Sequence, residues 1–257
     1  MYLSHLLIDV GDNPDRPRPG RLWLRNLYRV HQRLCMAFPS PSRVSDDADF
    51  LKPFKPEDFN RGQVHVSRGT DTGFLFRIDI QSGGRAVILV QSAIKPNWDY
   101  AFQNAGYLLA ALPEVKPFDP RFVKGEPLRF RLVTNPTKKR GTPLKEERQS
   151  LSIEEWKSTK GRNGRRVPVP ADQLLDWLAQ RAERAGFALE ADSVTVQAGY
   201  VYVDKTGNGA GEPLRSARYD GTLRITDVAL FRDALAGGIG PAKGFGFGLL
   251  SVARLRG

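Results

Sequence analysis

Apolar residues in this chain follow helical and strand spacings in alternating segments. Leu27, Val30, Leu34 and Phe38 recur at helical spacing and Pro39 follows them, which predicts a helix from residue 25 or 26 to about residue 38. The proline- and glycine-containing residues 11–20 before it are expected to form a loop, and residues 40–70 an irregular connection. The first helix is therefore bounded by two segments without regular structure.

The first half of the chain predicts one α+β unit. Its expected strands cover residues 2–10, 74–80, 86–91 and 128–133, and Ser82-Gly83-Gly84 predicts a hairpin between the second and third. A second helix is expected between Trp98 and Leu112. The resulting order, β-α-β-β-α-β, is typical of a ferredoxin-like domain. This interpretation places the N-terminal domain at residues 1–136, with residues 128–133 as its fourth strand.

The second half repeats the pattern less clearly. Helices are predicted over residues 171–185 and 228–236, and strands over residues 194–203, 217–225 and 249–255. The sequence thus predicts a tandem pair of ferredoxin-like α+β domains, with the C-terminal one at residues 171–257. Residues 137–170 are expected to form a basic linker that contacts RNA.

The net charge of +11 is concentrated in one segment. Residues 124–166 contain 13 basic and 5 acidic residues. Such a local excess favours a polyanionic partner, although a basic loop that only aids solubility has the same composition.

Glycine is concentrated near the end of the chain, where six of the twelve residues 237–248 are glycine and one, Lys243, is basic. A Walker loop requires Gly-Lys-Ser/Thr before a helix, whereas here Lys243-Gly244 precedes a strand-like run. A Rossmann turn also requires a helix after it. The segment therefore favours a backbone that approaches another polymer closely over a nucleotide-cofactor loop.

The remaining composition excludes several classes of site and location. Cys35 is the only cysteine, so neither a disulfide framework nor a thiolate metal cluster is expected. Asp46, Asp47 and Asp49 are interpreted as a solvated acidic turn, and we expect neither a metal nor a cofactor. The N-terminus predicts a strand and not a signal peptide, and no apolar run is long enough to span a membrane. We expect a soluble, cytoplasmic protein.

Tyr28 and His31 are the candidate catalytic residues, because they lie three positions apart on the predicted first helix. An imidazole that titrates near neutrality can transfer a proton during phosphodiester cleavage, and a phenol can assist it. A helical histidine beside an apolar stripe is more often a packing residue, so the spacing alone leaves both interpretations open.

Basic residues provide the candidate RNA contacts, since lysine and arginine bind phosphates and base edges. Trp156 and Phe245 are candidates either for base stacking or for the core. The candidate RNA-binding residues are Lys138, Lys139, Arg140, Lys160, Arg162, Arg165, Arg166, Lys243, Gly244 and Gly246.

Four segments, in the same order, resemble those of the CRISPR-associated endoribonuclease CasE family. They are Met1-Tyr-Leu-Ser, Leu27-Tyr28-x-x-His31-x-x-Leu34, Asn135-Pro136-x-Lys138, and Gly238-Ile-Gly-Pro-Ala-Lys243-x-x-Gly246-x-Gly248-Leu-Leu-Ser. The resemblance spans nearly the whole chain, and the terminal motif is the most specific. Val133-Thr134 replaces the Arg-Ala that the family commonly has before Asn-Pro.

The resemblance implies tandem ferredoxin-like (RRM-like) domains and metal-independent cleavage of CRISPR repeat RNA at the base of its stem-loop. The upstream 2′-hydroxyl would attack, leaving 2′,3′-cyclic phosphate and 5′-hydroxyl ends. His31 would act as general acid or base, and Tyr28 would orient the site or share proton transfer. Lys243 and the glycine segment would hold RNA or support the domain junction. The implied partners are the mature guide RNA and the other subunits of Cascade.

Two other functions fit the same fold. One is a non-catalytic subunit that binds the RNA hairpin, because ferredoxin-like domains often bind RNA without cutting it. The other is a scaffold whose basic surface meets acidic protein partners.

Overall fold

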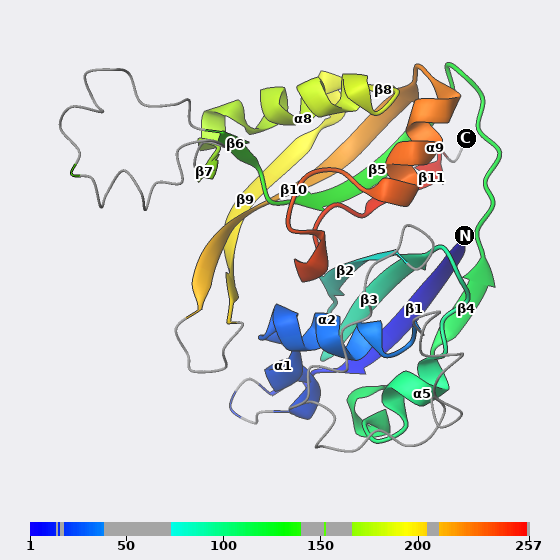
Figure 1. Cartoon of the computed structure of the whole chain (residues 1–257), viewed down its shortest axis with the longest axis vertical. Coiled ribbons are helices and arrows are strands. Elements are labelled where there is room, and N and C mark those ends of the chain that lie inside the picture. Colours follow the sequence, from blue (N-terminus) through cyan, green and yellow to red (C-terminus); the bar gives the residue numbers. More distant parts are fainter. Residues whose placement is uncertain are drawn as a thin grey trace.

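Two antiparallel sheets organise the chain (Figure 1). The computed structural model describes residues 1–13, 15, 18–38, 73–139, 152, 166–204 and 211–255. Each sheet belongs to one α+β unit with the ferredoxin-like strand order. The predicted tandem ferredoxin-like fold is therefore confirmed. No helix in these described ranges is long and apolar enough to cross a membrane.

The N-terminal unit contains the sheet with the order β2-β3-β1-β4. Helices α2 and α5 cover one face of this sheet and supply residues such as Leu34 and Phe102 to its core. Its elements are β1 (Tyr2–Asp9), α1 (Pro19–Leu24), α2 (Leu27–Cys35), β2 (Phe74–Ile80), β3 (Arg85–Ser92), α5 (Trp98–Phe102), the short 3₁₀ helix η2 (Gly106–Leu108) and β4 (Glu114–Pro117).

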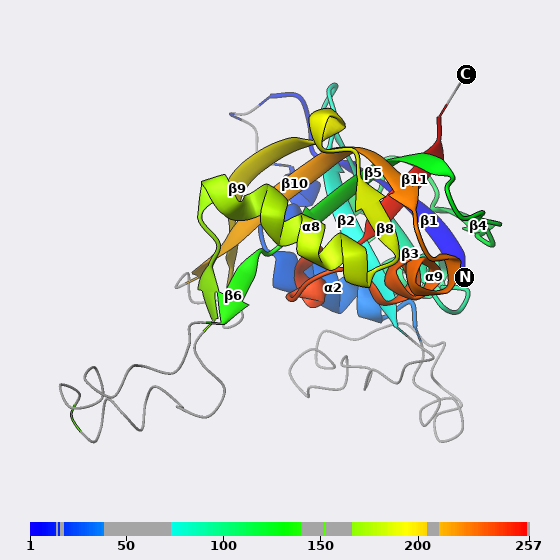
Figure 2. The same cartoon turned by 90° about the horizontal axis from the view of Figure 1, so that it is seen from above.

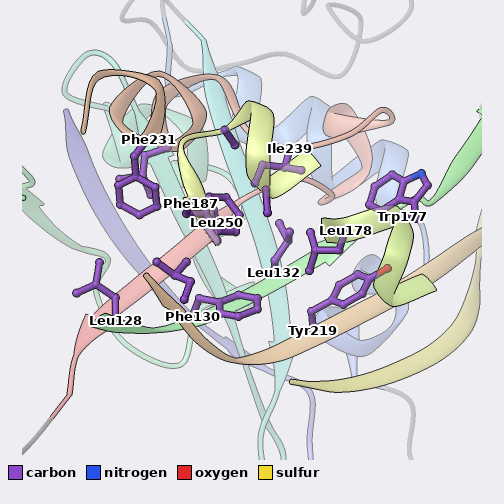
Figure 3. Close-up of a cluster of buried hydrophobic side chains, with 14 of the residues drawn as sticks. Leu128, Phe130, Leu132, Trp177, Leu178, Phe187, Tyr219, Phe231, Ile239 and Leu250 are labelled. Atoms are coloured by element: carbon purple, nitrogen blue, oxygen red, sulfur yellow. The ribbon is translucent and has the colours of Figure 1, made fainter. Parts of the chain in front are cut away.

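The C-terminal unit contains the sheet with the order β11-β5-β10-β8, and β9 also pairs with β10. Figure 2 shows α8 lying across this sheet, and α8 and α9 both pack on the core shown in Figure 3. Its elements are β5 (Pro127–Thr134), β6 (Thr137–Lys139), β7 (Arg166–Pro168), η3 (Ala171–Gln173), α8 (Leu174–Arg184), β8 (Phe187–Leu189), η4 (Ala191–Ser193), β9 (Thr195–Val203), β10 (Glu212–Ile225), α9 (Val228–Gly237), η5 (Lys243–Phe245) and β11 (Leu250–Arg254).

The strand predicted over residues 128–133 exists as β5, but its placement in the first unit is wrong. β5 pairs with β10 and β11 in the C-terminal sheet. The fourth strand of the first unit is β4, which pairs with β1. β4 has four residues, mostly exposed, and includes Pro117, so it lacks the hydrophobic alternation that identifies a strand.

Three other segments differ from the sequence-based expectation. Helix α1 begins inside the expected loop, because Pro19 occupies the first helical turn, where its missing N–H costs little. The helix expected between Trp98 and Leu112 is divided into α5 and η2. Within the expected linker, β6 pairs with β7.

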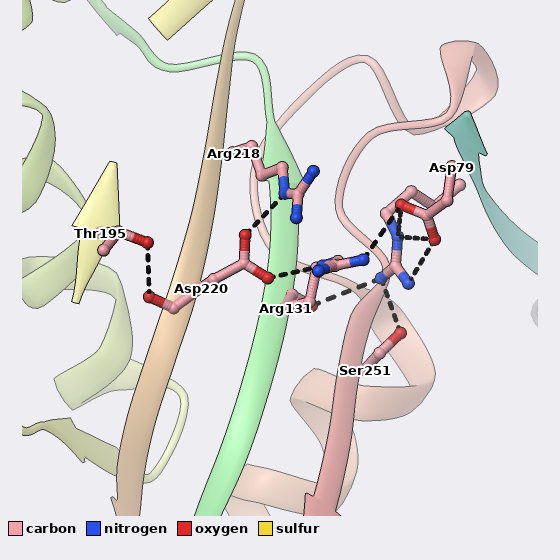
Figure 4. A network of polar contacts seen from close by, with 7 residues as sticks. Asp79, Arg131, Thr195, Arg218, Asp220 and Ser251 are labelled. Atoms are coloured by element: carbon pink, nitrogen blue, oxygen red, sulfur yellow. Dashed lines mark hydrogen bonds and ion pairs between the residues drawn. The ribbon is translucent and has the colours of Figure 1, made fainter. Parts of the chain in front are cut away.

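Polar contacts join the two units along β2 (Figure 4). The Arg77 guanidinium donates to both Asp79 and the Ser251 hydroxyl, the latter at 2.7 Å. Arg131 lies 3.7 Å from Asp79 and donates to Asp220 at 2.5 Å. Asp220 also accepts from Arg218 at 2.6 Å. Alternating charges therefore run from the N-terminal sheet across β5 to β10.

Asp220 is the acidic centre of this network on the C-terminal side. Burial alone would raise the pKa of Asp220, but hydrogen bonds from Arg218 and Arg131 outweigh it and hold the pKa below its ordinary value. The stability from the ionised carboxylate is therefore present above the unfolded-state pKa, about 3.9, and is lost as the pH falls through the folded-state pKa.

We expect Asp220→Asn to lower the free energy of unfolding by about 1 kcal/mol at pH 7, because two half-exposed arginines lose their anion. The difference from the wild type should shrink as the pH falls below about 4, where the carboxylate is protonated in the unfolded chain, and through the lower folded-state pKa, where it is protonated in the folded protein as well. Urea unfolding at a series of pH values measures this. A difference that stays constant between pH 7 and pH 3 would contradict the assignment.

Candidate active site and nucleic-acid interface

Helix α2 positions the two candidate catalytic side chains. The Asn26 side chain caps it by accepting from the backbone N–H groups of Tyr28 and Arg29, at 3.1 and 3.3 Å. Val30 and Leu34 are fully buried against the sheet. Tyr28 is half-buried and His31 is 9% exposed. The helix therefore places both side chains at the border of its buried face.

Aromatic rings fix the position of the His31 imidazole. It stacks on Phe74 at 5.6 Å between ring centroids and on Phe76 at 6.4 Å, with interplanar angles of 25° and 19°. The Cys35 sulfur lies 3.5 Å from Nε2. These largely apolar contacts restrain the plane of the ring, which is almost fully buried.

The glycine-rich segment packs directly against this site. η5 contacts both α2 and β2. Gly246 has φ +80°, and a Cβ there would lie 3.1 Å from the Phe76 ring. Gly238 has φ +72°, and its Cβ would lie 2.8 Å from the Leu75 side chain. The C-terminal unit thus reaches the strand that carries the aromatic contacts of His31.

Lys243 binds within the glycine-rich segment in this structure. Its ammonium donates to the backbone carbonyl of Gly237, the last residue of α9. A cation at a helix C-terminus is electrostatically favourable. Gly244 and Phe245 are half-buried in η5, and Gly246 is buried. The described contacts of Lys243 and Gly246 therefore hold the segment to α9 and β2.

Three candidate basic residues lie on the β6–β7 ladder. Lys139 pairs in register with Arg166, whose guanidinium donates to the Thr137 hydroxyl at 3.2 Å. Lys138 donates to the Gln173 side chain at 3.1 Å. The ladder therefore brings the two ends of the expected basic linker, residues 137–170, close together. Candidates that lie outside the described residues are Arg140, Trp156, Lys160, Arg162 and Arg165.

Further arginines, which the sequence interpretation missed, lie close to this ladder. Burial and the nearby charges of Arg184 and Arg166 lower the pKa of Arg181. Arg181 lies 3.7 Å over the Trp177 ring and donates to the Trp177 carbonyl. The i, i+3 spacing of Arg181 and Arg184 on α8 was the available signal.

Arg215 of β10 extends the same charged region. Both Arg181 and Arg215 act electrostatically on the buried Tyr219 hydroxyl, whose pKa burial raises. We call the resulting set the cationic stripe. Its members are Lys138, Lys139, Arg166, Arg181, Arg184 and Arg215.

Unpaired positive charge distinguishes this stripe from the domain junction. Among the described residues, none of its four arginines forms an ion pair with a carboxylate, whereas Arg77, Arg131 and Arg218 all do. Cations gathered without carboxylate partners are suited to a polyanion. Within the residues that the structure describes, no three His, Cys, Asp or Glu side chains lie close enough together to hold a metal ion.

Comparisons with known proteins agree with this architecture. The family model described as CRISPR associated protein matches residues 1–254. The CRISPR-associated endoribonuclease Cse3 of Thermus thermophilus is 32% identical over 203 residues, covering 73% of this chain and 84% of Cse3. The Cascade subunit CasE of Escherichia coli is 28% identical over 260 residues, covering 99% of this chain and all of CasE.

Solved structures show the same similarity in three dimensions. Thermus thermophilus Cse3 bound to an RNA representing a pre-cleavage complex has a TM-score of 0.66 at 25% identity, with 98% of each chain covered. Cas6e from Escherichia coli has a TM-score of 0.60 at 25% identity, covering 99% of this chain and all of Cas6e. Since sequence and fold agree over nearly the full length, the chain belongs to the family of CRISPR-associated proteins that includes Cse3 and CasE.

Proposed function

We propose that this chain is an endoribonuclease that cleaves CRISPR repeat RNA at the base of its stem-loop. The observation that carries the proposal is the position of His31, on a capped helix beside Tyr28 and in a chain related to a named endoribonuclease. In this proposal the cationic stripe holds the stem through its phosphates. The protein then stays bound to the mature guide RNA and joins other Cascade subunits; the related CasE is named as a subunit of Cascade.

The proposed reaction needs no group beyond the protein and its RNA. The 2′-hydroxyl upstream of the scissile phosphate loses its proton and attacks phosphorus, and the bond to the 5′-oxygen of the next nucleotide breaks. The products are a 2′,3′-cyclic phosphate and a 5′-hydroxyl, which takes up a proton. His31 supplies one of these two proton transfers, and Tyr28 orients the scissile group or shares the other transfer. Basic side chains offset the charge that develops on the phosphorane.

A second candidate function is hairpin binding without cleavage. The burial of the His31 ring against Phe74 and Phe76 favours it, because a packed ring can serve the core alone. The two functions share the cationic stripe and differ only in what His31 does.

We expect His31→Ala to slow cleavage of the cognate repeat RNA by about 10²- to 10⁴-fold, the usual contribution of a general acid or base. Affinity for the RNA should stay within about threefold of the wild type, because the stripe is untouched. His5→Ala is the matched control, since His5 is half-buried on β1 of the same unit. Gel-based single-turnover cleavage and filter binding supply the two readouts. Undiminished cutting by the His31 variant would remove His31 from the reaction, whereas a wild type that binds the RNA without cutting it would leave hairpin binding as the function.

The same cleavage assay tests whether the reaction is independent of metal ions and uses the 2′-hydroxyl as the nucleophile. We expect cutting to continue in EDTA, and a single 2′-deoxy sugar at the cut site to abolish cutting while binding persists. Mass spectrometry should identify the cyclic phosphate end. Cleavage lost in EDTA and restored by magnesium would contradict the proposed mechanism.

The glycine segment allows a second substitution test. We expect Gly246→Ala to reduce cleavage at least tenfold with little loss of RNA affinity, because its Cβ would press on the Phe76 ring that stacks on His31. The strained φ of +80° should also cost about 1 kcal/mol of stability. Gly237→Ala is the control, since a Cβ there meets nothing within 4 Å. Equal cleavage rates for the two variants would show that the packing of Gly246 does not influence the candidate active site.

The salt dependence of RNA affinity tests whether the cationic stripe binds phosphates. We expect Arg184→Ala and Arg166→Ala each to reduce the slope of log affinity against log salt by about one for a hairpin RNA. Arg224→Ala should change it less, because Glu190 already pairs with Arg224 at 2.9 Å. Titrations between roughly 50 and 200 mM salt measure the slope. Negligible RNA affinity at low salt would favour the protein scaffold instead.

A further inference from the structure

The β9–β10 hairpin carries two tyrosines that the proposed reaction does not use. Tyr200 is 58% exposed and Tyr202 is 64% exposed. They are two positions apart on β9, so they project from one face of the hairpin about 6.6 Å apart. Their partners across the ladder are Arg215 and Pro213. Two aromatic faces are thus displayed side by side next to a cation.

Strand alternation identifies the side of the sheet on which these rings lie. Val196 and Ala198 share their face and pair with Tyr219 and Ala217. Tyr219 and Ala217 belong to the core beneath α8, and the Tyr219 hydroxyl donates to the Leu174 carbonyl of that helix at 3.0 Å. The tyrosines therefore lie on the same side of the sheet as α8, beyond the part that α8 covers.

Arg215 links the tyrosines to the cationic stripe. Its guanidinium lies 5.1 Å from the Tyr200 ring centroid and donates to the Tyr200 hydroxyl at 3.0 Å. These contacts restrict the ring and place positive charge beside it. A flat ring next to a phosphate-binding cation is the arrangement that holds single-stranded nucleic acid.

The hairpin also reaches the candidate active site. β9 contacts α2, and Figure 1 shows the β9–β10 hairpin extending from the C-terminal sheet toward α1 and α2. Next to β6, the Asn135 side chain, in the connection between β5 and β6, donates to the Arg215 carbonyl of the hairpin at 2.7 Å. The tyrosines thus lie on the element that connects the stripe with the helix bearing His31.

We infer that Tyr200 and Tyr202 form a stacking platform for unpaired RNA bases that flank the stem, with Arg215 binding the adjacent phosphate. This inference rests on the proposed RNA-binding function and adds a site to it. Stacking uses the π-face that every base has, so the platform accepts these nucleotides without selecting their sequence. Its role is to hold the strand that runs between the stripe and α2.

The test compares two labelled probes on the full-length protein. One is an eight-nucleotide oligoadenylate, and the other is a ribose-phosphate chain of equal length without bases. The wild type should bind the oligoadenylate about tenfold or more tightly than the abasic chain, because each base that stacks on a tyrosine adds to the affinity. The Tyr200→Ala/Tyr202→Ala protein should lose this preference, and Tyr200→Phe/Tyr202→Phe should keep it. Tyr107→Ala, at a residue that is 68% exposed on the N-terminal unit, is the control.

The outcomes separate this inference from the proposed function. Tight hairpin binding without a preference for the oligoadenylate overturns the platform alone. A preference that survives the double alanine substitution also overturns it, because the bases then stack elsewhere. Loss of preference in the phenylalanine variants shows that hydrogen bonding and not stacking is involved, and overturns it as well. Cleavage by the His31 variant bears only on the proposed reaction.

Discussion

The close approach of the glycine segment to β2 is the constraint on which the candidate site depends. Gly246 and Gly238 pass so near Phe76 and Leu75 that a side chain at either position would displace its neighbour, and both have positive φ. Because Phe76 also stacks on His31, the position of the imidazole depends on a segment roughly two hundred residues away in the sequence. The helix supplies the ring, and the C-terminal unit supplies one wall of its site.

Strand β2 carries both connections between the units on its two faces. Phe74 and Phe76 point to the helical side and stack on His31. Arg77 and Asp79, which follow on β2, point the other way and bind Ser251 and Arg131 of the C-terminal unit. Period-two alternation therefore lets one short strand contact the His31 ring from one face and the C-terminal unit from the other. A substitution on one face can disturb the junction while leaving the aromatic stack in place.

Local signals in the sequence were sufficient for part of this arrangement. The helical spacing around Val30 predicted α2 and put Tyr28 and His31 on one side of it. No local signal distinguishes which sheet a strand joins, so β5 was assigned to the wrong unit; its partners β10 and β11 follow about 80 to 120 residues later. The arginines that α8 and β10 add to the stripe were missed for the same reason, because these elements meet β7 only after folding. Pairing distant in sequence is set by tertiary packing, which periodicity does not encode.

The residues proposed to bind the RNA and the residue proposed to transfer a proton lie on different units. This division affects how fast the proposed product would be released. The cationic stripe belongs to β6, β7, α8 and β10, whereas His31 belongs to α2. Only an RNA whose stem lies on the stripe and whose strand extends to α2 engages both. In the proposed reaction, breaking one phosphodiester bond beside α2 would remove none of the phosphate contacts that the stem would make with the stripe. Since those contacts dominate affinity, the proposed product dissociates about as slowly as the substrate. Slow release is a defect in a multiple-turnover nuclease, but it suits a protein that carries its RNA product into a larger complex.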